Sequence, residues 1–250
     1  MVVLKSTREI EAMATAGRIT AQILKEMGEI AKPGATTYDI DQFAASRCKD
    51  LRVKAAFKGQ YGFPASVCIS VNEEVVHGIP SKKRVLKEGD IVGCDFGVII
   101  DGWYGDSART FGVGKINTEA EKLLKVTEES LFKGIEMCTV ENRLFDIGHS
   151  IQNYVESFGY SVVREFVGHG IGKSLHEDPQ VPNYGPKGKG IPLKSGMVLA
   201  IEPMINVGGA QVRVLKDGWT AVTVDGSLSA HFEHTIAITD AGPRILTTLG

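Results

Sequence analysis

The chain repeats one sequence pattern, and each copy ends in an acidic residue. Residues 86–95 (LKEGDIVGCD) align without a gap with residues 193–202 (LKSGMVLAIE), and the same separation of 107 residues aligns 38–40 with 145–147. Similarity over so long a distance indicates two related halves packed together, not a solenoid of short repeats. Each copy leads from a glycine-containing loop into an apolar strand that presents a carboxylate at its far end. If the two halves bring these acids together where they meet, the buried negative charges would need a cation as a partner.

Length and composition are those of a globular domain with one large core. The chain has 250 residues, of which 43% are hydrophobic and 23% are charged. We expect a single domain over residues 1–250, with pseudo-symmetric halves of about 1–112 and 113–250, because no Ser- or Gly-rich linker separates them. The formal net charge of −2 gives no electrostatic signature of nucleic-acid or membrane binding.

We expect no secretory signal peptide and no membrane-spanning segment. Its N-terminal region is charged and lacks an apolar h-region, and no stretch reaches transmembrane length. Its cysteines lack Cys-x-x-Cys spacing, which is typical of reduced thiols and not of a disulfide framework. We therefore expect a cytoplasmic protein, and by default a monomer.

Hydrophobic periodicity predicts an α+β fold with an antiparallel sheet at its centre. Residues 6–9 (STRE) form a capping box that begins a helix, and residues 32–34 (KPG) end it. Further helices are expected from Thr36 or Thr37, from about Thr118, and over residues 144–158. Strands are expected at residues 67–71, 161–167, 197–207, 220–224 and 229–238.

A predicted β-hairpin brings two acids of the first half together. Asp101-Gly102 is a two-residue turn signal, which pairs residues whose numbers sum to 203 and so places Gly97 opposite Asp106. Asp95 lies two positions from Gly97 on the same face, so the two carboxylates are diagonal neighbours. Like charges this close are unfavourable without a proton or a metal between them.

The second half offers matching acids and imidazoles. Period-two alternation over residues 229–235 places His231, Glu233 and Thr235 on one face, which makes Glu233 an inward acid and gives His234 a structural role. His169 lies in the glycine-rich segment 168–172, on a backbone with little neighbouring bulk. His176 follows seven residues later in a polar loop.

Together these residues predict a metal site of one nitrogen and several oxygen ligands, formed by Asp95, Asp106, His169, Glu202 and Glu233. Such a set suits divalent Mn, Fe, Co or Zn, and not sites that prefer thiolates. Four carboxylates are too many for one tetrahedral zinc, so two ions sharing bridging acids fit better. A water shared between them would become hydroxide near neutral pH, which predicts hydrolysis.

Over nearly its whole length the chain resembles the type I methionine aminopeptidases, and in particular their short bacterial form. Six motifs occur in the family's order, at residues 70–80, 89–110, 168–172, 175–179, 201–203 and 232–235. The resemblance implies the pita-bread (creatinase/aminopeptidase) fold, with pseudo-twofold duplicated halves, a central antiparallel sheet and helices outside. It also implies removal of the N-terminal methionine from peptides and nascent polypeptides with a small second residue, and transient contact with the ribosome.

The resemblance also assigns roles to individual residues. Asp106 and Glu233 would bridge two metal ions, Asp95 would chelate one of them, and His169 with Glu202 would complete the other. Glu202 would also be the general base, while His176 would stabilise the oxyanion and His77 would position the substrate. These roles suit carboxylate and imidazole groups, whose protons move near neutral pH.

An apolar pocket for the methionine side chain matches Phe63, Cys68 and Trp219, with Tyr61 nearby. Met packs well against aromatic and sulfur groups because its thioether is flexible and polarizable. Two positions depart from the family pattern: Leu175 stands where relatives often have Phe, and Gln60 where some have an aromatic residue. These departures affect the shape of the pocket and not the catalytic set.

Two other functions remain open at the level of sequence. An Xaa-Pro aminopeptidase or dipeptidase shares the fold, but such enzymes normally carry an additional N-terminal domain and lack the FEHT segment found at residues 232–235. A non-catalytic peptide-binding relative is the other alternative, since fold alone does not imply function. It would be expected to have lost ligands, and all five are present. The identity of the metal ions is left open.

Overall fold

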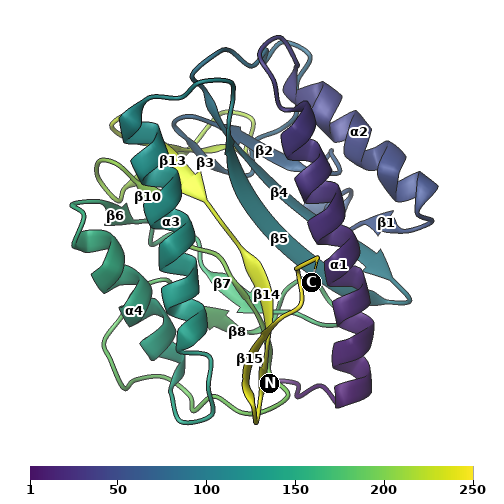
Figure 1. Ribbon diagram of the computed structural model, residues 1–250, viewed down its shortest axis with the longest axis vertical. Coiled ribbons are helices and arrows are strands. Elements are labelled where there is room, and N and C mark those ends of the chain that lie inside the picture. The colour runs from purple at the N-terminus through teal and green to yellow at the C-terminus, as the bar shows by residue number, and fades with distance from the viewer. Residues whose placement is uncertain (250) are drawn as a thin grey trace.

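The computed structural model describes residues 1–249, in which helices flank a set of antiparallel strands (Figure 1). The helices are α1 (Thr7–Ile30), α2 (Thr37–Asp50), α3 (Thr118–Glu136) and α4 (Leu144–Glu156), with a short 3-10 turn at Gln60–Gly62. The strands of the first half are β1 (Lys54–Ala55), β2 (Cys68–Val71), β3 (Glu74–Val76), β4 (Ile91–Ile100) and β5 (Trp103–Gly112). The remaining strands are β6 (Ser161–Val162), β7 (Gly168–Gly170), β8 (Glu177–Val181), β9 (Val198–Ile201), β10 (Met204–Asn206), β11 (Val212–Val214), β12 (Ala221–Thr223), β13 (Ser229–His231), β14 (His234–Thr239) and β15 (Gly242–Ile245).

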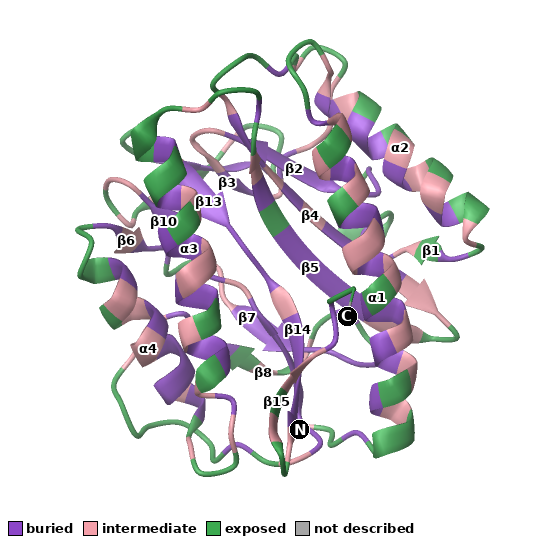
Figure 2. Cartoon of the chain, in the orientation of Figure 1, coloured by how far each residue is buried: buried purple, intermediate pink, exposed green. Residues whose placement is uncertain are grey.

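The helices begin where the sequence predicts, and α4 ends at Glu156, two residues before the predicted end. Ser6 and Glu9 form the expected capping box at the start of α1, which ends at Ile30, just before Lys32. A second capping box, made by Thr36, begins α2. The helices turn buried faces toward the strands and exposed residues outward (Figure 2). No helix within residues 1–249 combines the length and the apolar character that crossing a membrane requires.

Every strand pairing in the described chain is antiparallel, as predicted. The strands form four hydrogen-bonded groups: β1-β4-β2 with β5 on β4, β15-β14-β9-β7-β8, β13-β10-β6, and β11-β12-β3. Of these, β4 and β5 belong to the first half of the sequence, and β9 and β14 to the second. The cavity described below lies where these groups meet.

The sequence repeat corresponds to a repeat of structure. Helix α2 begins at Thr37 and α4 at Leu144, while β4 begins at Ile91 and β9 at Val198, so both pairs keep the separation of 107 residues. One apolar core packs around α1, α2 and β4, and another around α3, α4 and β9. The boundaries predicted for the halves, and the single-domain organisation, stay predictions.

The predicted strands differ most from the observed ones in three places. The strand expected at 197–207 breaks at Glu202-Pro203 between β9 and β10, and that expected at 229–238 breaks at Phe232-Glu233 between β13 and β14. Pro203 has no N–H to give to a ladder, which explains the first break. The strand expected at 161–167 is limited to Ser161–Val162. Irregular pairing of this kind is common beside active sites because it redirects side chains.

The β4–β5 hairpin has the predicted register. Gly97 is the partner of Asp106, and Asp95 is the partner of Ala108. The hairpin also lies very close to α1: a Cβ built on Gly105 would lie 2.7 Å from the backbone nitrogen of Gly17. Thr20 fixes the same contact, since its hydroxyl donates to the Gly105 carbonyl at 3.1 Å.

We predict that Gly105→Ala lowers the free energy of unfolding by about 3 kcal/mol, because the added methyl group meets helix backbone that cannot rotate away. Gly93→Ala is the matched control on the same hairpin, since its Cβ would approach no atom closer than 3.4 Å. Urea denaturation of both variants measures the difference. Equal stabilities would contradict the close packing of α1 on β5.

Candidate metal centre and peptide cavity

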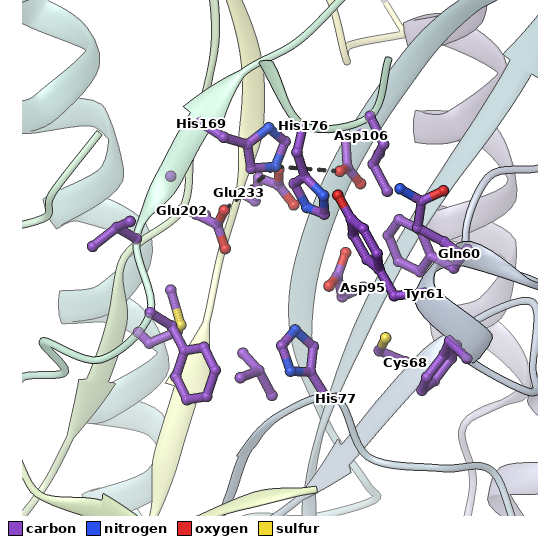
Figure 3. Close-up of a pocket in the computed structure, with 18 of the residues that line it drawn as sticks. Gln60, Tyr61, Cys68, His77, Asp95, Asp106, His169, His176, Glu202 and Glu233 are labelled. Carbon is purple, nitrogen blue, oxygen red and sulfur yellow. Dashed lines mark ion pairs between the residues drawn. The ribbon is translucent and has the colours of Figure 1, made fainter. Parts of the chain in front are cut away.

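A cavity of about 680 Å³ contains all the residues that the sequence predicts for a site. Figure 3 shows the acids and imidazoles pointing into it from strands and loops of both halves of the sequence. The predicted residues among its lining are Tyr61, Phe63, Cys68, His77, Asp95, Asp106, His169, His176, Trp219, Glu202 and Glu233. The structure therefore brings together the whole predicted set.

Side-chain hydroxyls join the strand that carries Asp106 to the segment that carries Glu233. The Thr235 hydroxyl donates to the Asp106 carbonyl at 2.7 Å and accepts from the Asp106 amide at 3.2 Å. The Ser107 hydroxyl donates to the Glu233 carbonyl at 2.6 Å, and the Glu233 amide donates to Ala108 at 2.8 Å. These bonds fix the backbone on both sides of the two acids, so their carboxylates are held close together.

Asp106, His169 and Glu233 form the tightest cluster, with one ligand atom from each lying within 4.8 Å of the others. His169 Nε2 lies 3.8 Å from Asp106 Oδ2 and 3.6 Å from Glu202 Oε1. His169 Nδ1 lies 2.9 Å from the carbonyl oxygen of Gly170, to which an N–H at that position donates. The lone pair of Nε2 then faces the acids, which is the arrangement of a metal-binding histidine.

The buried carboxylates lack partners within the protein. Oδ1 of Asp95, Oδ1 of Asp106 and Oε1 of Glu233 are all buried without a hydrogen bond. No Lys or Arg of residues 1–249 lines the cavity. An unpaired buried acceptor costs about 1–3 kcal/mol and more when charged, so these residues fit divalent cations bound among them.

Burial and mutual repulsion change the ionisation of the acids. Burial raises the pKa of Asp106 to about 7. Burial, together with the charge of Asp106, raises the pKa values of Asp95, Glu202 and Glu233 well above their ordinary range. Burial also lowers the pKa of His169 to about 3, so its imidazole is neutral and free to act as a ligand. A bound cation would reverse the effect on the acids by favouring their ionised forms.

Two further histidines lie beside the cluster. The rings of His176 and His169 have centroids 4.4 Å apart in an edge contact, and Tyr61 stacks on His176 at 5.9 Å. His77 has a left-handed backbone conformation (φ 60°) directly after β3, and its ring packs edge-on against Phe166. Burial lowers the pKa values of both His77 and His176. Left-handed backbone is unusual for a non-glycine residue and is often found at functional sites.

One end of the cavity is apolar. Phe63 and Trp219 meet edge to face with centroids 5.2 Å apart. Cys68 is the β2 partner of Asp95 on β4, so the apolar end adjoins the acids. Burial raises the pKa of the Cys68 thiol, which therefore behaves as a small apolar group. Leu175 is buried in the same apolar cluster, whereas Tyr61 lies on the rim with 76% of its surface exposed.

The turn that carries His176 is held by a buried ion pair. Lys5 Nζ donates to Glu177 Oε2 at 2.6 Å, and only 3% of the Lys5 side chain is exposed. Glu177 Oε1 accepts from the amides of Lys173 and Ser174 at 2.8 and 3.2 Å. The N-terminal segment thus fixes the loop from which His176 enters the cavity.

Sequence reasoning did not assign a role to three residues at the site. Phe166 and Met204 line the cavity, but nothing in their sequence context distinguished them from core residues. His231 is buried, and its Nε2 lies 3.4 Å from Glu202 Oε2. The alternation that placed His231 on the same face as Glu233 was a signal for it. By contrast, His234 lies outside the cavity, where Nδ1 pairs with the Thr247 hydroxyl, in keeping with its predicted structural role.

Comparison with known proteins identifies the family. The model of metallopeptidase family M24 matches residues 11–240. The chain belongs to metallopeptidase family M24. Within this family it is 58% identical to a methionine aminopeptidase of Clostridium acetobutylicum, over 99% of both chains. A crystal structure of methionine aminopeptidase from Thermotoga maritima superposes with a TM-score of 0.97 at 51% identity, covering 99% of this chain and 100% of that one.

The M24 comparison confirms the pita-bread fold predicted from sequence. It also separates the two peptidase alternatives. A prolidase from Pyrococcus horikoshii has a TM-score of 0.78 at 23% identity, and the match covers 65% of that chain. That similarity shows the shared fold alone, while the methionine aminopeptidases match in sequence over the full length.

For this M24 protein we predict that metal ions control how stability depends on pH. A carboxyl group with a raised pKa in the folded state contributes stability that is present at low pH and lost as pH rises through the folded value. For Asp106 the loss falls between its ordinary value of 3.8 and about 7. The metal-free protein should therefore lose about 3 kcal/mol of stability between about pH 5 and pH 8 relative to Asp106→Asn.

The measurement is chemical denaturation of both proteins across this pH range, without metal and with excess Mn²⁺. Added Mn²⁺ should stabilise the wild-type protein more at the higher pH, because it binds the ionised carboxylates. Parallel pH profiles for metal-free wild type and variant would contradict the buried, mutually repelling acids.

Proposed function

We propose that this protein removes the N-terminal methionine from peptides and nascent polypeptides, with a preference for a small second residue. Its full-length similarity to methionine aminopeptidases supports the proposal. The observation that carries it is the junction, in one cavity, of buried unpartnered carboxylates with an apolar pocket. A peptide whose methionine side chain filled that pocket would place its first peptide bond beside the acids.

The proposed cofactor is a pair of divalent ions, chosen from Co, Mn, Fe or Zn. Asp106 and Glu233 would bridge them, Asp95 would bind one, and His169 with Glu202 would bind the other. The unpartnered oxygens and the position of His169 Nε2 support this assignment. When bound, the ions supply Lewis acidity and lower the pKa of a coordinated water.

The other residues would handle protons and charge. Glu202, whose pKa burial raises, would accept the proton of the attacking water and deliver it to the departing amine. His176 would donate a hydrogen bond to the scissile carbonyl oxygen, where negative charge develops. His77 would orient the substrate from the opposite wall, held there by its contact with Phe166.

Phe63, Cys68 and Trp219 would bind the methionine side chain, with Tyr61 at the rim. Their edge-to-face packing and the neutral thiol favour a flexible thioether over a charged side chain. Because nascent chains are the proposed substrates, we propose that the protein works in the cytoplasm and contacts the ribosome transiently. We also propose that it is a monomer.

We predict cleavage of a Met-Ala peptide in the presence of Mn²⁺ or Co²⁺, and little cleavage of an Ala-Pro peptide of equal length. Excess chelator should abolish the activity, and added metal should restore it. Peptide products are measured by chromatography and mass spectrometry. Faster release from the Ala-Pro peptide would favour an Xaa-Pro peptidase, and no cleavage of either peptide would favour the non-catalytic alternative.

We predict that His176→Ala lowers kcat about 100-fold, the size expected for removing one oxyanion donor, while metal binding is retained. His149→Ala is the control, because His149 lies on α4 outside the cavity, against the Gly185 carbonyl. Steady-state kinetics and metal titration are measured on both variants. A kcat for His176→Ala close to that of the wild-type enzyme would remove the proposed role.

A further inference from the structure

Two imidazoles flank the carboxylate of Glu202, one on each oxygen. His169 Nε2 lies 3.6 Å from Oε1, and His231 Nε2 lies 3.4 Å from Oε2. His169 belongs to the proposed metal site, but the proposed mechanism leaves His231 without a task. The His231 side chain is 4% exposed, and its Nε2 is buried without a hydrogen bond.

The backbones that carry His231 and Glu202 are held by strand pairing and by side-chain hydrogen bonds. His231 is the β13 partner of Met204 on β10, and the Thr110 hydroxyl bonds to both its amide and its carbonyl at 2.9 Å. Glu202 lies in the break between β9 and β10, where its carbonyl accepts from Asn183 at 3.0 Å. His231 Nε2 and Glu202 Oε2 therefore lie opposite each other because the backbone on each side is held in place.

We propose that His231 is a positioning residue for Glu202. Its Nε2–H donates to Oε2, which orients the carboxylate so that Oε1 faces the side of His169. The separation of 3.4 Å is slightly longer than an ordinary N–H···O bond. Hydrogen bonds of catalytic groups are often long in ligand-free structures and shorten in the substrate complex.

This arrangement leaves one oxygen of Glu202 for metal binding and proton transfer while the other is anchored. A carboxylate that a hydrogen bond already holds in one orientation loses less rotational freedom when it binds a cation or accepts a proton. The inference rests on the proposed function, in which Glu202 is both a ligand and the base.

Two substitutions separate a hydrogen-bond donor from a space-filling ring. His231→Phe keeps a planar ring of similar size and removes the donor, whereas His231→Gln keeps an N–H that can reach Glu202. We expect His231→Phe to lower kcat about 10- to 100-fold with KM within about threefold of the wild-type value, and His231→Gln to recover most of that loss. Equal impairment of the two variants would overturn the donor role.

A second readout does not depend on turnover. Calorimetric titration of the metal-free protein with Mn²⁺ should show about tenfold weaker binding in His231→Phe and near-normal binding in His231→Gln, without a change in the number of ions bound. Loss of one ion from the stoichiometry would instead make His231 a ligand and would overturn the positioning role. Unchanged Mn²⁺ affinity together with unchanged kcat would leave His231 a packing residue.

A double-mutant cycle tests whether the effect passes through Glu202. In the Glu202→Gln background, His231→Phe should weaken Mn²⁺ binding no further, because the group that it orients has been changed. A full additional loss in that background would overturn the proposal. If the wild-type protein cleaved no Met peptide, the proposed function would fail, while the Mn²⁺ cycle would still report on the His231–Glu202 contact.

Discussion

Four carboxylates share one buried space, and the fold must hold them together against their mutual repulsion. No Lys or Arg of the described chain lines the cavity, and three of the carboxylate oxygens have no hydrogen-bond partner. Without a cation, the protein responds by raising the pKa values of these groups, so protons stand in for the missing charge. Divalent ions would satisfy the same oxygens at neutral pH without the cost of keeping protons on acids. The cation requirement is thus a property of the donor set, and the family assignment agrees with it.

Asp95 and Asp106 lie on the continuous β4–β5 ladder, whereas hydroxyl groups hold the segment that carries Glu233 against β5. The Thr235 hydroxyl bonds to the backbone of Asp106, and the Ser107 hydroxyl donates to the backbone carbonyl of Glu233. A regular ladder would turn alternate side chains to opposite faces, whereas hydroxyl bonds allow the segment at residues 232–233 to leave the strand and still be held. Glu202 likewise leaves the regular strand, at the break between β9 and β10 that Pro203 causes. Each second-half acid of the cluster therefore lies where regular pairing stops.

The sequence predicted best what local geometry determines. The two-residue turn at Asp101-Gly102 sets the hairpin register, so the pairing of Gly97 with Asp106 could be derived and is observed. Pro203 marked the interruption at 202–203, because proline lacks the N–H that a ladder needs. The interruption at 232–233 could not be derived, because the partner strand decides where pairing ends. The contact between His231 and Glu202 likewise depends on the register of β10 with β13, which no single turn sets because β11 and β12 lie between them in the sequence. The apolar pocket was available only from family resemblance, since Phe63 and Trp219 meet through distant parts of the chain.

The pocket forms where the repeat is broken. The separation of 107 residues relates α2 to α4 and β4 to β9, but the strand equivalent to β5 is delayed by the segment that contains β11 and β12. Strand β12 pairs with β3 of the first half through Ala221 and Val76, which carries Trp219 over to Phe63 and next to His77. Two symmetric halves would supply matching acids, but they would not make one end of the cavity apolar and the other acidic. The added β11–β12 pair supplies that asymmetry, so the apolar end of the cavity and its cluster of acids have separate structural origins.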